Sequence, residues 1–295
     1  MDNRTDMTLD AFLETAWSEH ADHPQDVADR LQASQHLVQL PDHVPPYARL
    51  VTHVFGEHLG QWDRGVDLLE SLRRLPAFDG GVAASSAVNR GIATLRYAGG
   101  DSAALDALAV EDRVAALAGA ASAFTGHNAF ARALAAYSEA LRIGENGLPA
   151  ASLAIRALAI GGNNLAAALE EKKDRDSAET AGMINAAEAA LKYWKKAGTW
   201  LEEERAEYRL TRSLLAGGLH GAAVVSALRC IAVCERNNAP AFEQFFGYAA
   251  LALAQRQGGD HRSFEISRIR AQHLLEQVAP EERQWCEADR SQLEA

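Results

Sequence analysis

The sequence has few cysteines and no excess of basic charge. Its three cysteines, Cys230, Cys234 and Cys286, are too few for a structural zinc site of four ligands with knuckle-like spacing, and we expect buried thiols. The 29 lysines and arginines against 40 acidic residues give a formal net charge of -11. That balance argues against a sequence-independent binder of nucleic acid or of anionic membranes, because such proteins need a basic face.

Segments that would carry the chain into a membrane are also missing. The longest apolar stretch, 148–169, contains Arg156 and a Gly-Gly-Asn-Asn interruption, so we expect no membrane span. The N-terminus, MDNRTDMTLDAF, carries acids where a secretory leader would carry basic residues and an apolar run. We therefore expect a cytoplasmic protein that binds neither membranes nor nucleic acid.

Catalytic motifs are missing as well: the sequence contains no phosphate-binding loop, no His-Glu-x-x-His and no nucleophile elbow. The ten histidines are scattered. His20 and His23 flank a helix end, and His53 and Glu57 lie four apart on one helix, next to His58. Two ligands at helical spacing are common by chance, so we interpret these side chains as solvated or hydrogen-bonded. We expect no catalytic residue, no metal site and no cofactor.

What the sequence does contain is helical periodicity in nearly every segment, without the alternation typical of strands. The stretch 148–169 is apolar on almost every side and predicts a central helix covered by its neighbours. The helices expected from periodicity and from proline and glycine positions are 8–20, 25–39, 46–59, 62–75, 82–98, 102–109, 111–125, 128–143, 149–171, 176–197, 200–216 and 241–257.

Recurring glycines indicate that these helices form repeated hairpins. In HLGQWDRGVDLLESLRRLP, Gly60 marks a turn, the small Gly65 allows two helices to approach closely, and Pro76 stops the second helix. Gly60 and Gly100 are 40 residues apart, and a pair near the C-terminus, Gly218 and Gly259, are 41 apart. A period in this range predicts a solenoid of helix pairs.

The text NNLAAALEEKKDRDSAETAGMINAAEAALKYW resembles a tetratricopeptide (TPR) repeat. Leu165 and Ala166 stand at the leucine-small pair of the first helix, and Ala178 and Ala186 at small positions of the second. The resemblance implies an all-α, right-handed superhelical solenoid of six or seven antiparallel helix pairs. We expect N-terminal capping helices over 1–45, TPR-like repeats over 46–279 and a C-terminal capping helix over 280–295.

Arginines without nearby acids are the sharpest sign of a site. On helix 200–216, Arg205, Arg209 and Arg212 share a face, and only Arg205 has an acid, Glu202, three or four residues away. Arg156 stands alone in its apolar helix, where a buried guanidinium would need a partner. The nearby acids, Glu202 to Glu204, lie in a first helical turn, where they stabilise the helix dipole without catalysis.

The resemblance gives these residues a place. Some TPR proteins grip the C-terminal carboxylate of a peptide with Asn, Lys and Arg from successive first helices. Asn164 precedes Leu165 as the asparagine of such a clamp would, and Arg209 and Arg205 match its basic positions. The preceding repeat has Ala118 and Ser122 at the corresponding places, so at most half a clamp is present.

The function we expect is a non-enzymatic scaffold that binds an acidic segment or chain terminus of another protein or peptide in a concave groove. Arg205, Arg209 and Arg212 would supply charge, Asn163 and Asn164 would hydrogen-bond the partner's backbone, and Arg156 would pair with a carboxylate. Three alternatives remain open. The arginines pair internally, the stack closes on a small anionic ligand or short signalling peptide as a sensor, or the surface serves self-association.

Overall fold

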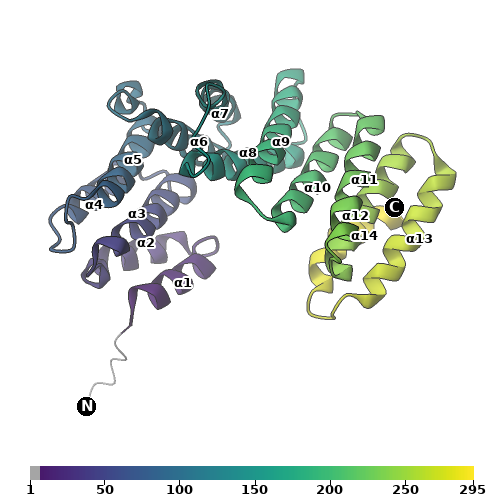
Figure 1. Ribbon diagram of the computed structural model, residues 1–295, viewed down its shortest axis with the longest axis horizontal. Coiled ribbons are helices and arrows are strands. Elements are labelled where there is room, and N and C mark those ends of the chain that lie inside the picture. Colours follow the sequence, from purple (N-terminus) through teal and green to yellow (C-terminus); the bar gives the residue numbers. More distant parts are fainter. Residues whose placement is uncertain (1–6) are drawn as a thin grey trace, which may run out of the picture. The chain divides into compact units, whose positions relative to one another are not determined.

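The structure of the protein, a computed structural model, describes residues 7–295. Residues 1–6, which supplied part of the argument against a secretory leader, lie outside the described residues. Within 7–295 every regular element is helical, and consecutive helices pack as pairs (Figure 1). The prediction of an all-α fold is confirmed. None of the helices in this part of the chain has the length and apolar character needed to cross a membrane.

The chain forms two compact units, 1–157 and 158–295, and the boundary lies within α8. The first unit contains α1 (Leu9–Glu19), α2 (Pro24–Ala33), α3 (Val44–His53), η3 (Val54–His58), α4 (Trp62–Leu72), α5 (Val82–Ala98), α6 (Val110–Gly126) and α7 (Phe130–Gly144). The second contains α9 (Ser177–Ala197), α10 (Trp200–Ala216), α11 (His220–Arg236), α12 (Ala241–Gln257), α13 (His261–Gln277) and α14 (Arg283–Glu294). Helix α8 itself runs over Leu153–Glu171.

The first unit has a continuous apolar core built from α1 to α5. Helix α3 and the η3 turn that continues it form one segment, here called the α3 segment. The fully buried side chains of the core include Tyr47 and Phe55 from this segment, Leu69 from α4 and Leu95 from α5. The Gly60 hairpin has the predicted form: Gly60 adopts a left-handed φ of 61°, and α4 packs back against α5 and the α3 segment.

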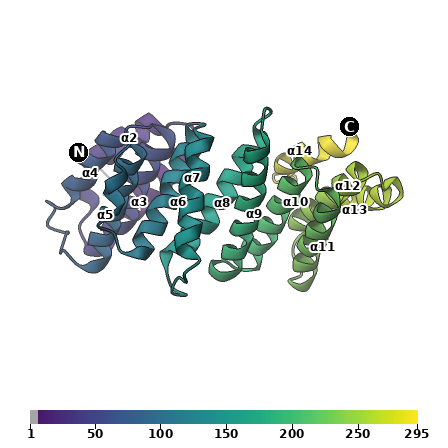
Figure 2. The same ribbon diagram turned by 90° about the horizontal axis from the view of Figure 1, so that it is seen from above.

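In the second unit each helix packs on the next from α9 through α13, and α10 and α14 both contact α12. Figure 2 shows α14 beside α10 and α12. Asp176 and Thr199 cap α9 and α10 through reciprocal capping boxes with Glu179 and Glu202, which satisfy backbone N–H groups of each first turn. Gly218 and Gly259, after α10 and α12, have φ values of 74° and 82°, as expected of helix terminators.

Several element boundaries were wrong. The helix predicted over 25–39 ends at Ala33, where Ser34 leaves helical geometry, and only a 3-10 turn (Gln35–Leu37) follows. The helix predicted over 102–109 is a 3-10 turn, Ser102–Leu105, capped by the side chain of Asp101. The helix predicted over 46–59 is α-helical to His53 and continues as the π-helical turn η3.

The Gly-Gly-Asn-Asn sequence does not interrupt α8. The helix is continuous through it, and both glycines, Gly161 and Gly162, are buried. Burial against neighbouring side chains here outweighs the low helix propensity of glycine.

The tight approach at Gly65 leads to a first prediction. A Cβ added at Gly65 would lie 2.6 Å from Leu95 Cδ1 and 2.8 Å from Phe55 Cβ, so Gly65→Ala should destabilise the protein by about 1–3 kcal/mol through overpacking. The control is Gly221→Ala in α11, where a Cβ would meet no atom within 4 Å and the substitution should be neutral or slightly stabilising. Urea unfolding followed by circular dichroism measures both, and equal effects of the two variants would contradict the close approach.

Candidate functional site

Helix α10 places its three arginines on one side, and each guanidinium has a carboxylate from another helix of the second unit. Arg205 Nη2 lies 2.6 Å from Glu243 Oε1 of α12. Arg209 Nη1 lies 2.5 Å from Glu170 Oε2 at the end of α8. Arg212 Nη1 lies 3.4 Å from Asp289 Oδ1 of α14. The acids that the local sequence did not supply come from other helices, so the internal-pairing alternative describes the geometry of these arginines.

The partner carboxylates are far less exposed than surface acids. The side chains of Glu243 and Asp289 are each 7% exposed, and that of Glu170 is 11% exposed. Burial raises the pKa of Glu170 despite the opposing influences of Arg209 and of the hydroxyl of Ser213, which donates to it over 2.6 Å. Carboxylates held this way would be costly to leave unpaired, so the arginines are bound into the packing of the unit.

The C-terminal helix α14 brings its acid onto the same side of α10. Asp289 accepts the hydroxyl of Tyr208 at 2.9 Å on both carboxylate oxygens, and Arg212 also donates to Gln292 Oε1 at 2.9 Å. Burial, and next the charge of Asp289, raise the pKa of the Tyr208 phenol well above its usual value, so Tyr208 stays a hydrogen-bond donor.

The exposure of the three guanidiniums differs. The Arg205 side chain is 58% exposed, whereas those of Arg209 and Arg212 are 25% and 22% exposed. Glu243 takes the Nε–H and one Nη2–H of Arg205, and a guanidinium has five donors. Arg205 is therefore the arginine of α10 that can still receive a second acceptor.

The other predicted site residues lie on α8. Asn163 and Asn164 are half-buried, with 3.5 Å between Asn163 Nδ2 and Asn164 Oδ1. Arg156 was expected to be buried, but it is exposed and belongs to the first unit. Burial, and next the charge of Arg156, lower the pKa of Arg49, so Arg156 adds to a local positive field in that unit.

Two acids of α10 are buried, and the helix dipole does not account for them, contrary to what was expected of Glu204. Glu202 does cap the helix, but Glu204 is 1% exposed and Glu207 is fully buried. Glu207 accepts Arg229 Nε at 2.9 Å and the hydroxyl of Ser226 at 2.9 Å. Both acids lie too far along the helix for the macrodipole to explain them, and both face helix–helix contacts.

Glu204 is a buried carboxyl group whose surroundings raise its pKa strongly. Burial raises the pKa of Glu204 to about 8, and the Cys230 thiol donates to its Oε1 at 3.1 Å. The negative charge of Glu243 also favours the neutral form. All three cysteines are buried free thiols, as expected, and contact with Cys234, followed by burial, raises the pKa of Cys230. The raised pKa favours the neutral form of Glu204, which lies beside the Arg205–Glu243 pair.

These partners left weak traces in the sequence. Glu243 is the only acid of α12, but it lies in the first turn, where an acid is common without a buried partner. The acids Glu170 and Asp289 lie 39 and 77 residues from the arginines they contact, and no local spacing rule reaches that far.

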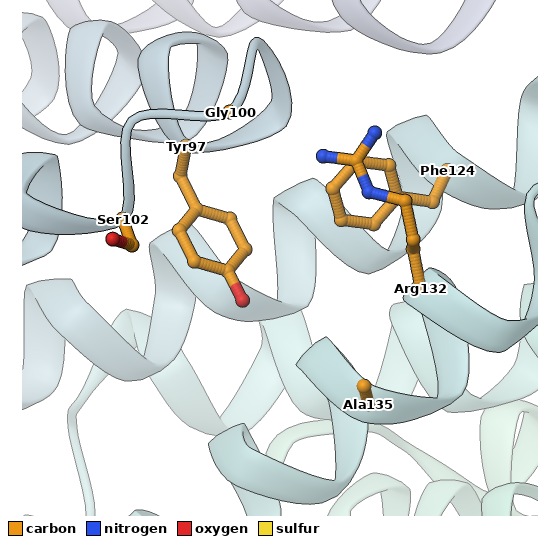
Figure 3. A pocket seen from close by; sticks show the side chains of 6 residues that line it. All are labelled: Tyr97, Gly100, Ser102, Phe124, Arg132 and Ala135. Atoms are coloured by element: carbon orange, nitrogen blue, oxygen red, sulfur yellow. The ribbon is translucent and has the colours of Figure 1, made fainter.

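A small pocket in the first unit has a volume of about 240 Å³ (Figure 3). Tyr97, Ser102 and Phe124 line it together with Arg132. The Arg132 guanidinium lies 4.0 Å from the centre of the Phe124 ring and donates to the carbonyl of Ala98 at 3.0 Å. The pocket is smaller than most ligand pockets, and its cation is already engaged. This geometry gives little support to a sensor that closes on a small anion.

Comparisons with known proteins place the fold. The structure matches a crystal structure of a candidate kinesin light chain of Podosopora anserina with nearly identical TPR-like repeats, at a TM-score of 0.50 and 14% identity over 80% of this chain and 96% of that one. A crystal structure of a variant of the same protein gives a TM-score of 0.47 at 14% identity, covering 86% and 96% of the two chains. No protein-family model and no curated protein matches the sequence. The chain has a TPR-like repeat fold of sequentially paired helices, as the sequence predicted.

The buried pair on α10 leads to a second prediction. Arg209→Ala strands Glu170, which is 11% exposed, and should lower the free energy of unfolding by about 3 kcal/mol. The control is Arg268→Ala in α13, which breaks a 2.6 Å pair with Glu265, 52% exposed, and should cost less than about 1 kcal/mol. Equal losses in urea titrations would show that Glu170 is not held by Arg209.

The neutral carboxyl of Glu204 leads to a third prediction, on pH dependence. The folded protein holds a proton on Glu204 up to about pH 8, whereas the unfolded chain releases it near pH 4.5, so this group makes stability fall as the pH rises from 4.5 to 8. Glu204→Gln replaces the carboxyl group with a neutral amide that does not ionise. Between pH 4.5 and pH 8 the variant should therefore lose a few kcal/mol less stability than the wild type, and its stability relative to the wild type should be highest at pH 8. Parallel stability curves for wild type and variant between pH 5 and pH 8 would contradict the raised pKa.

Proposed function

We propose that the protein is a non-enzymatic scaffold for protein–protein interaction, and that the arginine side of α10 receives an acidic segment of a partner. TPR-like helix pairs present long rows of helix surface, which suit extended or helical peptides better than small substrates. The carboxyl groups described above serve as partners of internal cations and thiols, an arrangement that stabilises the stack and favours binding over catalysis.

The observation that carries the proposal is the seating of α14. This helix belongs to the chain itself, and its Asp289 is bound by Tyr208 and Arg212 of α10. The same side of α10 therefore has the donors that an acidic helical segment requires. A partner segment would bind beside α14, through the exposed part of Arg205, or would replace α14 on Tyr208 and Arg212.

Asn163 and Asn164 extend this proposal to α8, where their half-buried amides would hydrogen-bond the backbone of the segment. Arg209 contributes mainly by fixing Glu170, and so the end of α8, in place. Arg156, the remaining predicted site residue, lies in the first unit and is not assigned to this side of α10.

A fourth prediction tests the role of Arg205. Three fluorescent peptides of about 15 residues would be compared by anisotropy: one rich in Asp and Glu, its Asn and Gln counterpart, and a basic one. Wild type should bind the acidic peptide at least about 10-fold more tightly than the other two, with an affinity that falls as salt rises. Arg205→Gln should lose about 10-fold of that affinity, the worth of one charge-assisted hydrogen bond.

The matched control is Arg268→Gln on α13, which removes a positive charge from an exposed pair away from α10 and should leave the affinity unchanged. Circular dichroism of each variant confirms that it is folded. No binding of the acidic peptide, equal binding of all three peptides, or equal losses in the two variants would refute the proposed site.

A further inference from the structure

Three histidines from different elements of the first unit lie together. His20 ends α1, His53 ends α3 and His58 ends η3. One ring nitrogen of each lies within 4.8 Å of the corresponding nitrogens of the other two. His53 Nε2 and His58 Nε2 are 3.1 Å apart. All three side chains are half-buried, so an ion from solvent could reach them.

The π-helical turn η3 creates this arrangement. In an α-helix, residues five apart are separated by about 140° around the axis, and His53 and His58 would point in different directions. A π-turn closes a hydrogen bond between residues five apart, as Leu59 N does to Val54 O at 3.1 Å, and so brings such residues to one side. π-turns inside helices occur often at functional sites.

The end of α6 holds the π-turn in place. His127 Nε2 donates to the carbonyl of Gly56 at 2.9 Å. Gly126 packs so closely on η3 that an added Cβ would lie 2.2 Å from the carbonyl oxygen of Glu57. The geometry of His58 is therefore set by tertiary contacts and does not depend on the local helix alone.

Hydrogen bonds on the far side of two rings orient them toward the cluster. His20 Nδ1 lies 2.6 Å from the carbonyl of Trp17, which can only accept, so Nδ1 carries the proton and Nε2 a lone pair. His53 Nδ1 lies 3.1 Å from Glu57 Oε2, which likewise puts the proton on Nδ1 and a lone pair on Nε2, the atom that faces His58 Nε2. Histidine that donates one N–H to a carbonyl or carboxylate and offers the other nitrogen is typical of metal sites.

The chemistry of the donors selects the ion. Three neutral imidazoles suit Zn²⁺, Cu²⁺ or Ni²⁺ and do not suit Ca²⁺ or Mg²⁺, which prefer oxygen. A tetrahedral Zn²⁺ places its nitrogen ligands about 3.3 Å apart, close to the His53–His58 separation, and rotation of the His20 ring would close the third side.

We propose that His20, His53 and His58 form a binding site for a divalent transition-metal ion, best matched by Zn²⁺, with a fourth coordination position open. Glu57 is a positioning residue that orients His53 and supplies negative charge beside the ion. Since His20 belongs to α1 and the other ligands to the α3 segment, the ion would cross-link the start of the chain to the rest of the first unit.

The fifth prediction tests this site on the full chain, without a histidine tag and stripped with chelator. Titration of Zn²⁺ against a chromophoric competitor should give one tight site per chain. Single variants His20→Gln, His53→Gln and His58→Gln should each weaken it by more than about 100-fold, and Glu57→Gln by about 10- to 100-fold, as for other residues that orient a metal ligand.

The matched control is His23→Gln. His23 is exposed, lies three residues from His20 and should not affect binding. Two further readouts do not depend on the variants: Zn²⁺ should raise the Tm of wild type, and Co²⁺ should give the visible spectrum of a four-coordinate ion. Binding that His23→Gln weakens as much as His20→Gln, or an unchanged wild-type Tm together with no tight site, would overturn the proposal.

Discussion

Small side chains at the helix contacts set the spacing on which the fold depends. Gly65, Gly91 and Gly126 each lie where a single added carbon would meet another element at 2.6 Å or less. The side chains of helices this close interdigitate and leave no room for water between the helices. Any charged group on such a face must therefore find its partner on the facing helix, and this constraint governs the polar residues as much as the apolar ones.

In the second unit that constraint explains why α10 carries so many charges. Its arginines contact acids of α8, α12 and α14, and its own Glu207 contacts Arg229 of α11. Each pair fixes which helix lies opposite which. Buried ion pairs add little net stability compared with apolar packing. If the helices packed in another order, however, several buried charges would be left without partners. The charges of α10 thus mainly specify which helices pack against it in this unit.

The sequence predicted the fold well because its signals are local. Helical periodicity, the turn at Gly60 and the terminators Gly218 and Gly259 depend on residues a few positions apart, and the structure has them all. The failures were also local in origin: Ser102–Leu105 is too short for propensity to distinguish a 3-10 turn from an α-helix, and periodicity cannot reveal the π-turn after His53. The pairing of Arg209 with Glu170, across 39 residues, depends on how hairpins stack, which helical periodicity does not specify.

The two polar clusters differ in what would complete them. Around α10, guanidinium donors face carboxylate acceptors: each arginine of the helix has a carboxylate within the chain, and the exposed part of Arg205 is left accessible to a partner. Around His58, imidazole nitrogens face other imidazole nitrogens. One proton can bridge two facing imidazole nitrogens such as those of His53 and His58, but a third ring nitrogen in the same place adds another lone pair and no donor. An anion cannot satisfy lone pairs that converge in this way, whereas a cation can, and the π-turn that brings them together is otherwise an unfavourable way to continue α3.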